Sequence, residues 1–176
     1  MASLKAFLPH LAKIVGKTAD ELYSRQRALT QIGVLKATEG RGPGSGVPLS
    51  GEAIAAMVIA LLAADNLQQT TNKRIFRTCN ARPPKGGTTG RLAGATNFQT
   101  ALAKVLVAEE GSDLVSIHRG FYADIVCSKG NADESTTRFV IAHQFRSLPI
   151  KIIAEMEPEY IRYISRALRA ALGGPT

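Results

Sequence analysis

Arg25, Gln26 and Arg27 place two guanidinium groups and one side-chain amide next to each other in the chain. A guanidinium can donate two hydrogen bonds to guanine, and a glutamine amide can both donate to adenine and accept from it. Tyr23 and Ser24 come directly before them, and their hydroxyl groups suit phosphate oxygens. These residue types in one short segment indicate contact with a DNA groove and with the backbone beside it.

A basic, glycine-dense loop at 39–46 follows, with the sequence Glu-Gly-Arg-Gly-Pro-Gly-Ser-Gly. Because glycine has no side chain, such a loop can lie close to a nucleic-acid backbone. Arg41 stands within the loop, where its guanidinium could enter a minor groove or bind a phosphate. We therefore expect the loop and the Arg25–Arg27 segment to contact the same ligand.

Two short helices are expected to position these groups. Apolar residues at three- and four-residue spacing predict a helix over about 3–15, which Gly16 ends. Thr18 and Glu21 have the spacing of a capping box, so a second helix begins at Thr18 and runs to about residue 32, with Gly33 as its left-handed cap. The apolar residues of this second helix, which we expect to face inward, are Leu22, Leu29 and Ile32.

The helix pair around Gly16 resembles the helix-turn-helix pattern, with Val15 beside the turn and Leu22 beyond it. The resemblance covers about 20 of the 176 residues and has the specificity of a superfamily pattern. Two residues depart from it, because Lys17 and Arg25 stand where apolar residues are common.

With loop 40–46 as a wing, the region resembles the winged helix-turn-helix DNA-binding superfamily. The resemblance implies that helix 18–32 lies in the major groove and that the wing grips the backbone. A third helix over 51–64, capped by Ser50, would close the core. The outward side chains of helix 18–32 would be Thr18, Ala19, Tyr23, Ser24 and Arg27, with Gln26 on the flank.

The positive charge of the chain is concentrated in its middle. Residues 1–65 hold seven Lys/Arg and five Asp/Glu, residues 66–108 hold seven and none, and residues 109–176 hold eight and nine. The net charges are therefore +2, +7 and −1, which together give the +8 of the whole chain. A localised basic segment attracts polyanions, of which nucleic acid is the commonest.

The basic segment has the composition of a connector. Residues 81–91 are rich in proline and glycine, and at most one or two helical turns are expected around 73–77. We expect residues 67–96 to add attraction to DNA that does not depend on base sequence. The cations expected to supply this attraction are Lys73, Arg74, Arg77, Lys85 and Arg91.

The periodicity changes after residue 97, which is the expected N-cap of a further helix. Alternating and β-branched residues then predict strands at 114–118, 121–126 and 136–143, with a turn at 128–135. Residues 150–153 fit either a strand or the start of a helix, and a last helix is expected over 159–172. The fold class is therefore α+β, with a helical winged helix-turn-helix part followed by a small antiparallel sheet and flanking helices.

Other chemistries are disfavoured by the sequence. Neither glycine loop has the Lys-Ser/Thr ending of a phosphate-binding loop. Cys127 with His118 or His143, oriented by Asp124, could form a nucleophile, but no activating motif surrounds them and structural roles are favoured. We expect no enzyme activity, cofactor or metal ion. We assign Glu155, Glu157 and Glu159 to the start of the last helix rather than to acid–base chemistry.

Two cysteines far apart, at 79 and 127, fit a reducing cytoplasm and form neither a zinc motif nor a disulfide framework. No apolar run is long enough to cross a membrane, and we expect no secretion signal and no membrane partner.

These observations predict a cytoplasmic, sequence-specific DNA-binding regulator of transcription that binds double-stranded DNA as a homodimer. The expected organisation is a DNA-binding part at 1–66, a basic connector at 67–96 and an α+β part at 97–176. This last part would dimerise or contact another protein such as RNA polymerase. The alternative is a protein-interaction or inhibitor protein of the mobile-element type, with a basic face but no operator of its own. An RNA-binding role is weaker, because the strands lack the paired aromatic residues of a stacking sheet.

Overall fold

The computed structural model describes residues 2–38, 46–66, 69–83, 85, 87–88, 90–108, 112–119, 122–129, 133–140 and 153–173. Its helices are α1 (Leu4–Val15), α2 (Ala19–Gln31), α3 (Gly51–Ala63), α4 (Gln69–Cys79), α5 (Phe98–Val107) and α6 (Pro158–Leu172), with a short 3-10 helix η1 (Gly90–Leu92) before α5. Its strands are β1 (Ser112–His118), β2 (Tyr122–Lys129), β3 (Asp133–Val140) and β4 (Ile153–Met156). The expected α+β class is confirmed.

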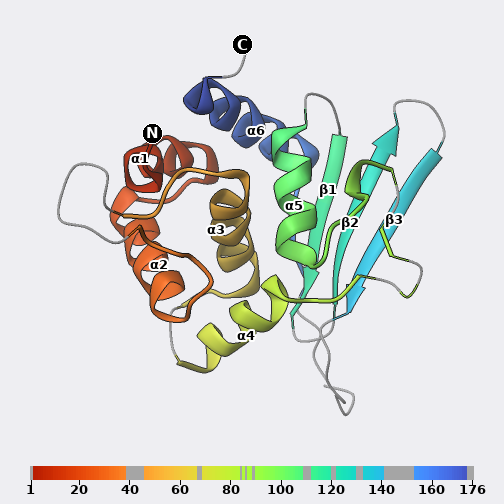
Figure 1. Ribbon diagram of the computed structural model, residues 1–176, viewed down its shortest axis with the longest axis horizontal. Coiled ribbons are helices and arrows are strands. Elements are labelled where there is room, and N and C mark those ends of the chain that lie inside the picture. The colour runs from red at the N-terminus through yellow and green to blue at the C-terminus, as the bar shows by residue number, and fades with distance from the viewer. Residues whose placement is uncertain are drawn as a thin grey trace.

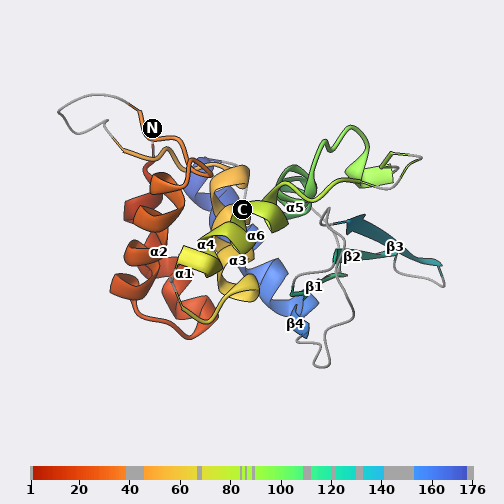
Figure 2. The same cartoon turned by 90° about the horizontal axis from the view of Figure 1, so that it is seen from below.

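Figure 1 shows α1 and α2 at one end of the molecule and the sheet at the other, with α3 and α5 between them. Helix α3 is buried nearly all round, as expected for a helix with no polar face. It contacts α2, α4, α5 and β1, so it is the centre of the fold. Figure 2, seen from below, shows α4 in front of α3.

The sheet is antiparallel, in the order β3-β2-β1-β4. Val115 on β1 pairs with Ile125 on β2 and with Met156 on β4, so these side chains share one face. That face is buried, and α3 and α6 contact β1. Phe139 on β3 meets Phe98 of α5 edge to face, with ring centroids 5.4 Å apart.

The helix ends follow local rules that the sequence predicted. Gly16 has a φ of 64° after α1, and the Thr18–Glu21 capping box at the start of α2 is complete. Ser50 caps α3 through the amide of Ala53. Asn97 caps α5, and Pro158 stands in the first turn of α6.

Two expectations about the chain after residue 66 need correction. The turn expected at 128–135 is wrong in extent, because Lys129 pairs with Asp133 and main-chain pairing does not require apolar side chains. Helix α4 is 11 residues long and exceeds the expected one or two turns. Residues 141–143 of the third expected strand and 150–152 of the apolar run before β4 lie outside the described residues.

The basic segment packs on both neighbouring parts of the chain. Ala81 and Leu92 are buried in the same core as the helices and the sheet, and the backbone of Arg82 pairs with that of Val140 on β3. A single hydrophobic cluster therefore includes residues from 1–66, 67–96 and 97–176. The three-part division of the chain stays a prediction.

Candidate nucleic-acid interface

Helix α2 presents one polar side to solvent. Asp20, Ser24, Arg27 and Gln31 are all exposed, and their spacing places them along one side of the helix. Tyr23 is 37% exposed on the flank of this stripe, and the Lys5 ammonium of α1 lies 5.0 Å from the centre of its ring. We call Asp20, Ser24, Arg27 and Gln31 the outer face of α2. Of these four, sequence reasoning had selected Ser24 and Arg27.

The expectation that Arg25 and Gln26 face a groove is wrong, because both are buried, at 7% and 8% exposure. They fall between Leu22 and Leu29 on the inward side of α2, as the three- to four-residue period requires. Arg25 donates from Nη1 to the carbonyl oxygens of Ala60 and Ala64, each at 3.1 Å. The guanidinium is therefore part of the core.

Two arginines from distant segments donate hydrogen bonds to the backbone carbonyl oxygens at the C-terminal end of α3. Besides its bonds to residues 60 and 64, Arg25 donates from Nη2 to the backbone oxygen of Asp65 at 3.3 Å. Arg119, which follows β1, donates from Nε to the carbonyl of Leu62 at 2.9 Å and binds the Asp65 carboxylate through both terminal nitrogens. The last carbonyls of a helix lack partners within it, so these guanidiniums complete its end.

Two charged residues at this end of α3, Arg25 and Asp65, have pKa values below their ordinary ones. Burial lowers the pKa of the Arg25 guanidinium from its ordinary value. Hydrogen bonds from Arg119 hold the pKa of the Asp65 carboxyl below its usual range. Asp65 therefore stays ionised and holds Arg119 against the end of α3.

The two residues that bracket the expected wing pair with each other. Thr38 and Gly46 form an antiparallel bridge, with the Thr38 amide donating to the Gly46 carbonyl at 2.9 Å. Pro48 forms a second antiparallel bridge, with Ser3. Residues 46–48 therefore pair with Thr38 at one end and with the N-terminal segment at the other. Arg41 and the rest of loop 40–45 lie outside the described residues.

The cations of the basic segment differ in their surroundings. Lys73, Arg74, Arg77 and Lys85 are exposed, as expected. Arg91 is only partly exposed, and its guanidinium binds the buried carboxylate of Asp113 on β1. Arg91 thus joins η1 to the sheet, and its contact with DNA stays a prediction.

Of the residues considered for a nucleophile, His143 lies outside the described part of the chain. The backbone of Cys127 pairs with that of Asp113, a register position on the other face of the sheet from that of His118. The Asp124 carboxylate is bound bidentately by Arg138 at 3.0 and 3.1 Å and lies 3.9 Å from Nε2 of His118. For the other cysteine, burial raises the pKa of the Cys79 thiol to about 12, which leaves it an inert thiol.

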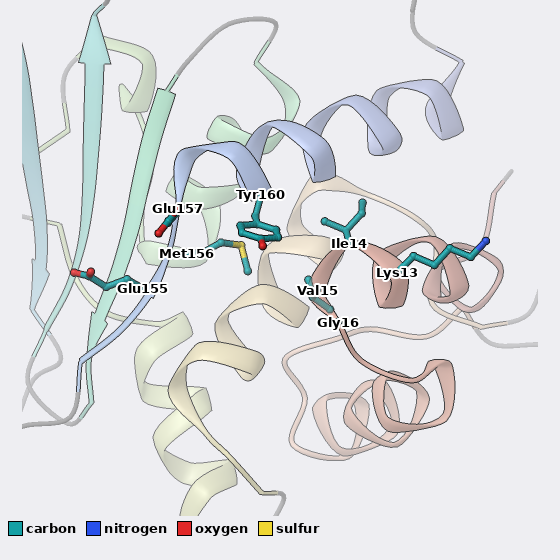
Figure 3. Close-up of a pocket in the computed structure, with 8 residues that line it drawn as sticks. All are labelled: Lys13, Ile14, Val15, Gly16, Glu155, Met156, Glu157 and Tyr160. Atoms are coloured by element: carbon teal, nitrogen blue, oxygen red, sulfur yellow. The ribbon is translucent and has the colours of Figure 1, made fainter.

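A groove of about 620 Å³ lies between the end of α1 and the junction of β4 with α6. Figure 3 shows Tyr160 and Met156 opposite Ile14 and Val15, whereas Lys13 points away into solvent. The other residues along the groove are Gly16, Glu155 and Glu157. The groove shares no residue with the outer face of α2 and is a separate feature of the molecule.

The described residues contain no cluster of three or more side chains suited to a metal ion. Within the same residues, no helix is long and apolar enough to cross a membrane.

No protein-family model, curated protein or solved structure matches this chain.

Proposed function

We propose that this chain is a cytoplasmic, sequence-specific DNA-binding regulator of transcription, with the outer face of α2 in the major groove. The observation that carries the proposal is the exposed stripe of a guanidinium, an amide, a hydroxyl and a carboxylate on one capped helix. Arg27 suits guanine, Gln31 suits adenine and Asp20 can accept from the amino group of cytosine. Ser24, Tyr23 and the Thr18 end of the helix suit the backbone.

The pairing around the expected wing supports this proposal. A hairpin that follows a groove-reading helix can reach the backbone beside the groove, and Thr38 with Gly46 brings the two ends of loop 39–45 together. Arg41 within that loop would bind a phosphate or enter the minor groove. The exposed cations of α4 would add attraction that does not depend on base sequence.

The proposed homodimer would use the outer side of α6. Tyr160 and Tyr163 are exposed there, at 45% and 46%, although the inner stripe of Ile161, Ile164 and Leu168 is buried. Two copies would bring two α2 helices to two half-sites of an operator. Sedimentation of the wild-type chain should show a dimer, and Tyr163→Asp should give a monomer that keeps its fold.

The proposal is tested by selecting bound duplexes from a random pool at two salt concentrations. We expect a preferred sequence, bound at least about a thousandfold more tightly than random DNA. Arg27→Ala should weaken binding to that sequence about tenfold, whereas Lys104→Ala, which removes an exposed lysine from α5, should not. The absence of a preferred duplex, together with a stable complex with a protein, would support the inhibitor alternative instead.

A further inference from the structure

Helix α4 has an outer face that no described part of the molecule covers. Lys73, Phe76, Arg77 and Asn80 are exposed and are neighbours at three- or four-residue spacing. Ile75 and Cys79 lie on the opposite side of the helix and are buried in the core. The position of the helix is therefore fixed, and its outer face is held toward solvent.

This outer face contains features that are unfavourable in an isolated helix. Lys73 and Arg77 are like charges at i and i+4, and the helix has no acidic residue in its first turn to balance them. Within the described residues neither forms an ion pair. Phe76 lies within one turn of both cations, with 46% of its surface exposed. A ligand that is both anionic and aromatic would neutralise the two cations and cover the exposed ring.

The surroundings of the helix extend the positive surface. Arg82 and Lys85 follow α4 and are exposed, and residues 66–108 contain no carboxylate in the sequence. Asp65, just before this segment, is already held by Arg119. An approaching polyanion therefore meets a run of cations with a single aromatic ring among them.

We propose that the outer face of α4 binds an unpaired nucleic-acid strand, with Phe76 stacked on a base and Lys73 and Arg77 at the phosphates on either side. Bases can stack on a protein aromatic ring once they are unpaired and splayed out, and this contact tolerates any base sequence. The inference rests on the proposed function in its ligand class, nucleic acid, but uses residues separate from the outer face of α2.

An acidic peptide fits this face less well. A docking amphipathic helix is held by several apolar anchors, and Phe76 is the only large exposed apolar residue that the described part of α4 offers. One ring with two cations within a helical turn matches one base with its neighbouring phosphates. The face therefore favours a strand over a peptide.

The test uses the full chain and the tryptophan that can be introduced at this site. The natural chain contains no tryptophan, so Phe76→Trp creates a single fluorescent reporter. The probe is a single-stranded DNA of mixed sequence, on the order of ten nucleotides long, which spans a typical binding site. We expect wild-type affinity for Phe76→Trp and quenching of its fluorescence on binding.

Removal of the ring should separate stacking from charge. Phe76→Ala should bind the single strand roughly ten times more weakly, since stacking on an aromatic side chain contributes about this much per base. Val107→Ala, at a residue with similar exposure on α5, and Lys104→Ala, in the same acid-free segment, should bind as the wild type does. Thermal unfolding checks that all four variants remain folded.

Three results would overturn the inference. They are unchanged single-strand affinity in Phe76→Ala, unquenched fluorescence in the bound Phe76→Trp variant, and competition by polyglutamate as strong as that by the oligonucleotide. The duplex selection with Arg27→Ala is read separately. Duplex discrimination that depends on Arg27, together with single-strand binding that ignores Phe76, would remove this inference alone. The reverse pattern would remove the proposed function and leave the α4 site.

Discussion

Helices α2 and α4 both carry clustered cations, but they differ in where those cations point. On α2, Arg25 is buried against the end of α3 and Arg27 is exposed. On α4, Lys73, Arg74 and Arg77 are all exposed. The availability of a cation is therefore set by its position relative to the buried stripe of its helix, and the count of basic residues in a segment does not reveal it.

The reason for the difference lies in α3. This helix ends at Ala64 in extended backbone, without the left-handed glycine that would close its last carbonyls. Its end is buried under α2, so water does not take the place of a donor for Ala60 and Ala64. The guanidinium of Arg25 supplies the hydrogen bonds to these carbonyls. The cations of α4 are exposed and do not complete the end of a buried helix in this way.

The largest expected effect comes from changing the two arginines of α2 separately. Arg25→Ala leaves buried carbonyl oxygens without donors and should lower the free energy of unfolding by about 3 kcal/mol. Arg27→Ala, at an exposed position two residues away, should change it by less than about 0.5 kcal/mol. Urea unfolding of both variants measures the difference. Equal stability losses would mean that Arg25 does not complete the end of α3.

The second expected effect distinguishes base reading from charge attraction. Arg27→Ala should relax discrimination between the selected and a random duplex by about tenfold. The double variant Lys73→Ala/Arg77→Ala should weaken binding to both duplexes alike and reduce the logarithmic salt slope by about two. Titrations of each duplex at several salt concentrations give both quantities. A double variant that loses discrimination would place base reading on α4 and reverse the comparison.

A smaller effect is expected at the start of α2. Thr18 accepts the Glu21 amide at 3.2 Å, and its own amide donates to the Glu21 carboxylate at 3.0 Å. Thr18→Ala should lower the free energy of unfolding by about 1 kcal/mol. Ser24→Ala, which removes an exposed hydroxyl from the middle of the same helix, is the control and should change the free energy of unfolding by less than about 0.5 kcal/mol. Equal effects at the two positions would show that the capping box does not stabilise α2.

The smallest effect is the acid dependence of that cap. Hydrogen bonds from the Thr18 backbone and side chain lower the pKa of Glu21 below its ordinary 4.5. Because the folded pKa is the lower one, this contribution is complete above pH 4.5 and is lost as the pH falls through the lowered value. Glu21→Gln should therefore flatten the decline in stability below pH 4.5, as followed by unfolding at several pH values. An unchanged decline in this variant would assign the acid sensitivity to other carboxylates.

The sequence predicted features that depend on near neighbours. Gly16, the Thr18–Glu21 capping box, Ser50 and Asn97 were all identified as helix ends, since a cap acts within one turn of the chain. The inward apolar stripe of α2 was identified too, and it already contained the signal that Arg25 lies between Leu22 and Leu29. That signal conflicts with the rarity of charged residues that are buried without a partner, and the partners of Arg25 are distant in the sequence.

Features that depend on distant partners could not be predicted in this way. The carbonyls that accept from Arg25 lie 35 and 39 residues further along the chain, and the carboxylate that binds Arg91 lies 22 residues away. Helix α4 was underestimated because its sequence is polar, and only its contact with α3 shows why Ile75 and Cys79 anchor it. Gln31 of the outer face could have been found by continuing the period from Ser24 through Arg27.

The measurement that tests the account most directly is the affinity ratio between the selected duplex and a random duplex, for the wild type and for Arg27→Ala. We expect a ratio of about a thousand or more for the wild type. For the variant we expect a ratio about ten times smaller, with little change in its affinity for random DNA. A wild-type ratio near one, or a full ratio retained in Arg27→Ala, would contradict the assignment of the outer face of α2 as the DNA-reading surface.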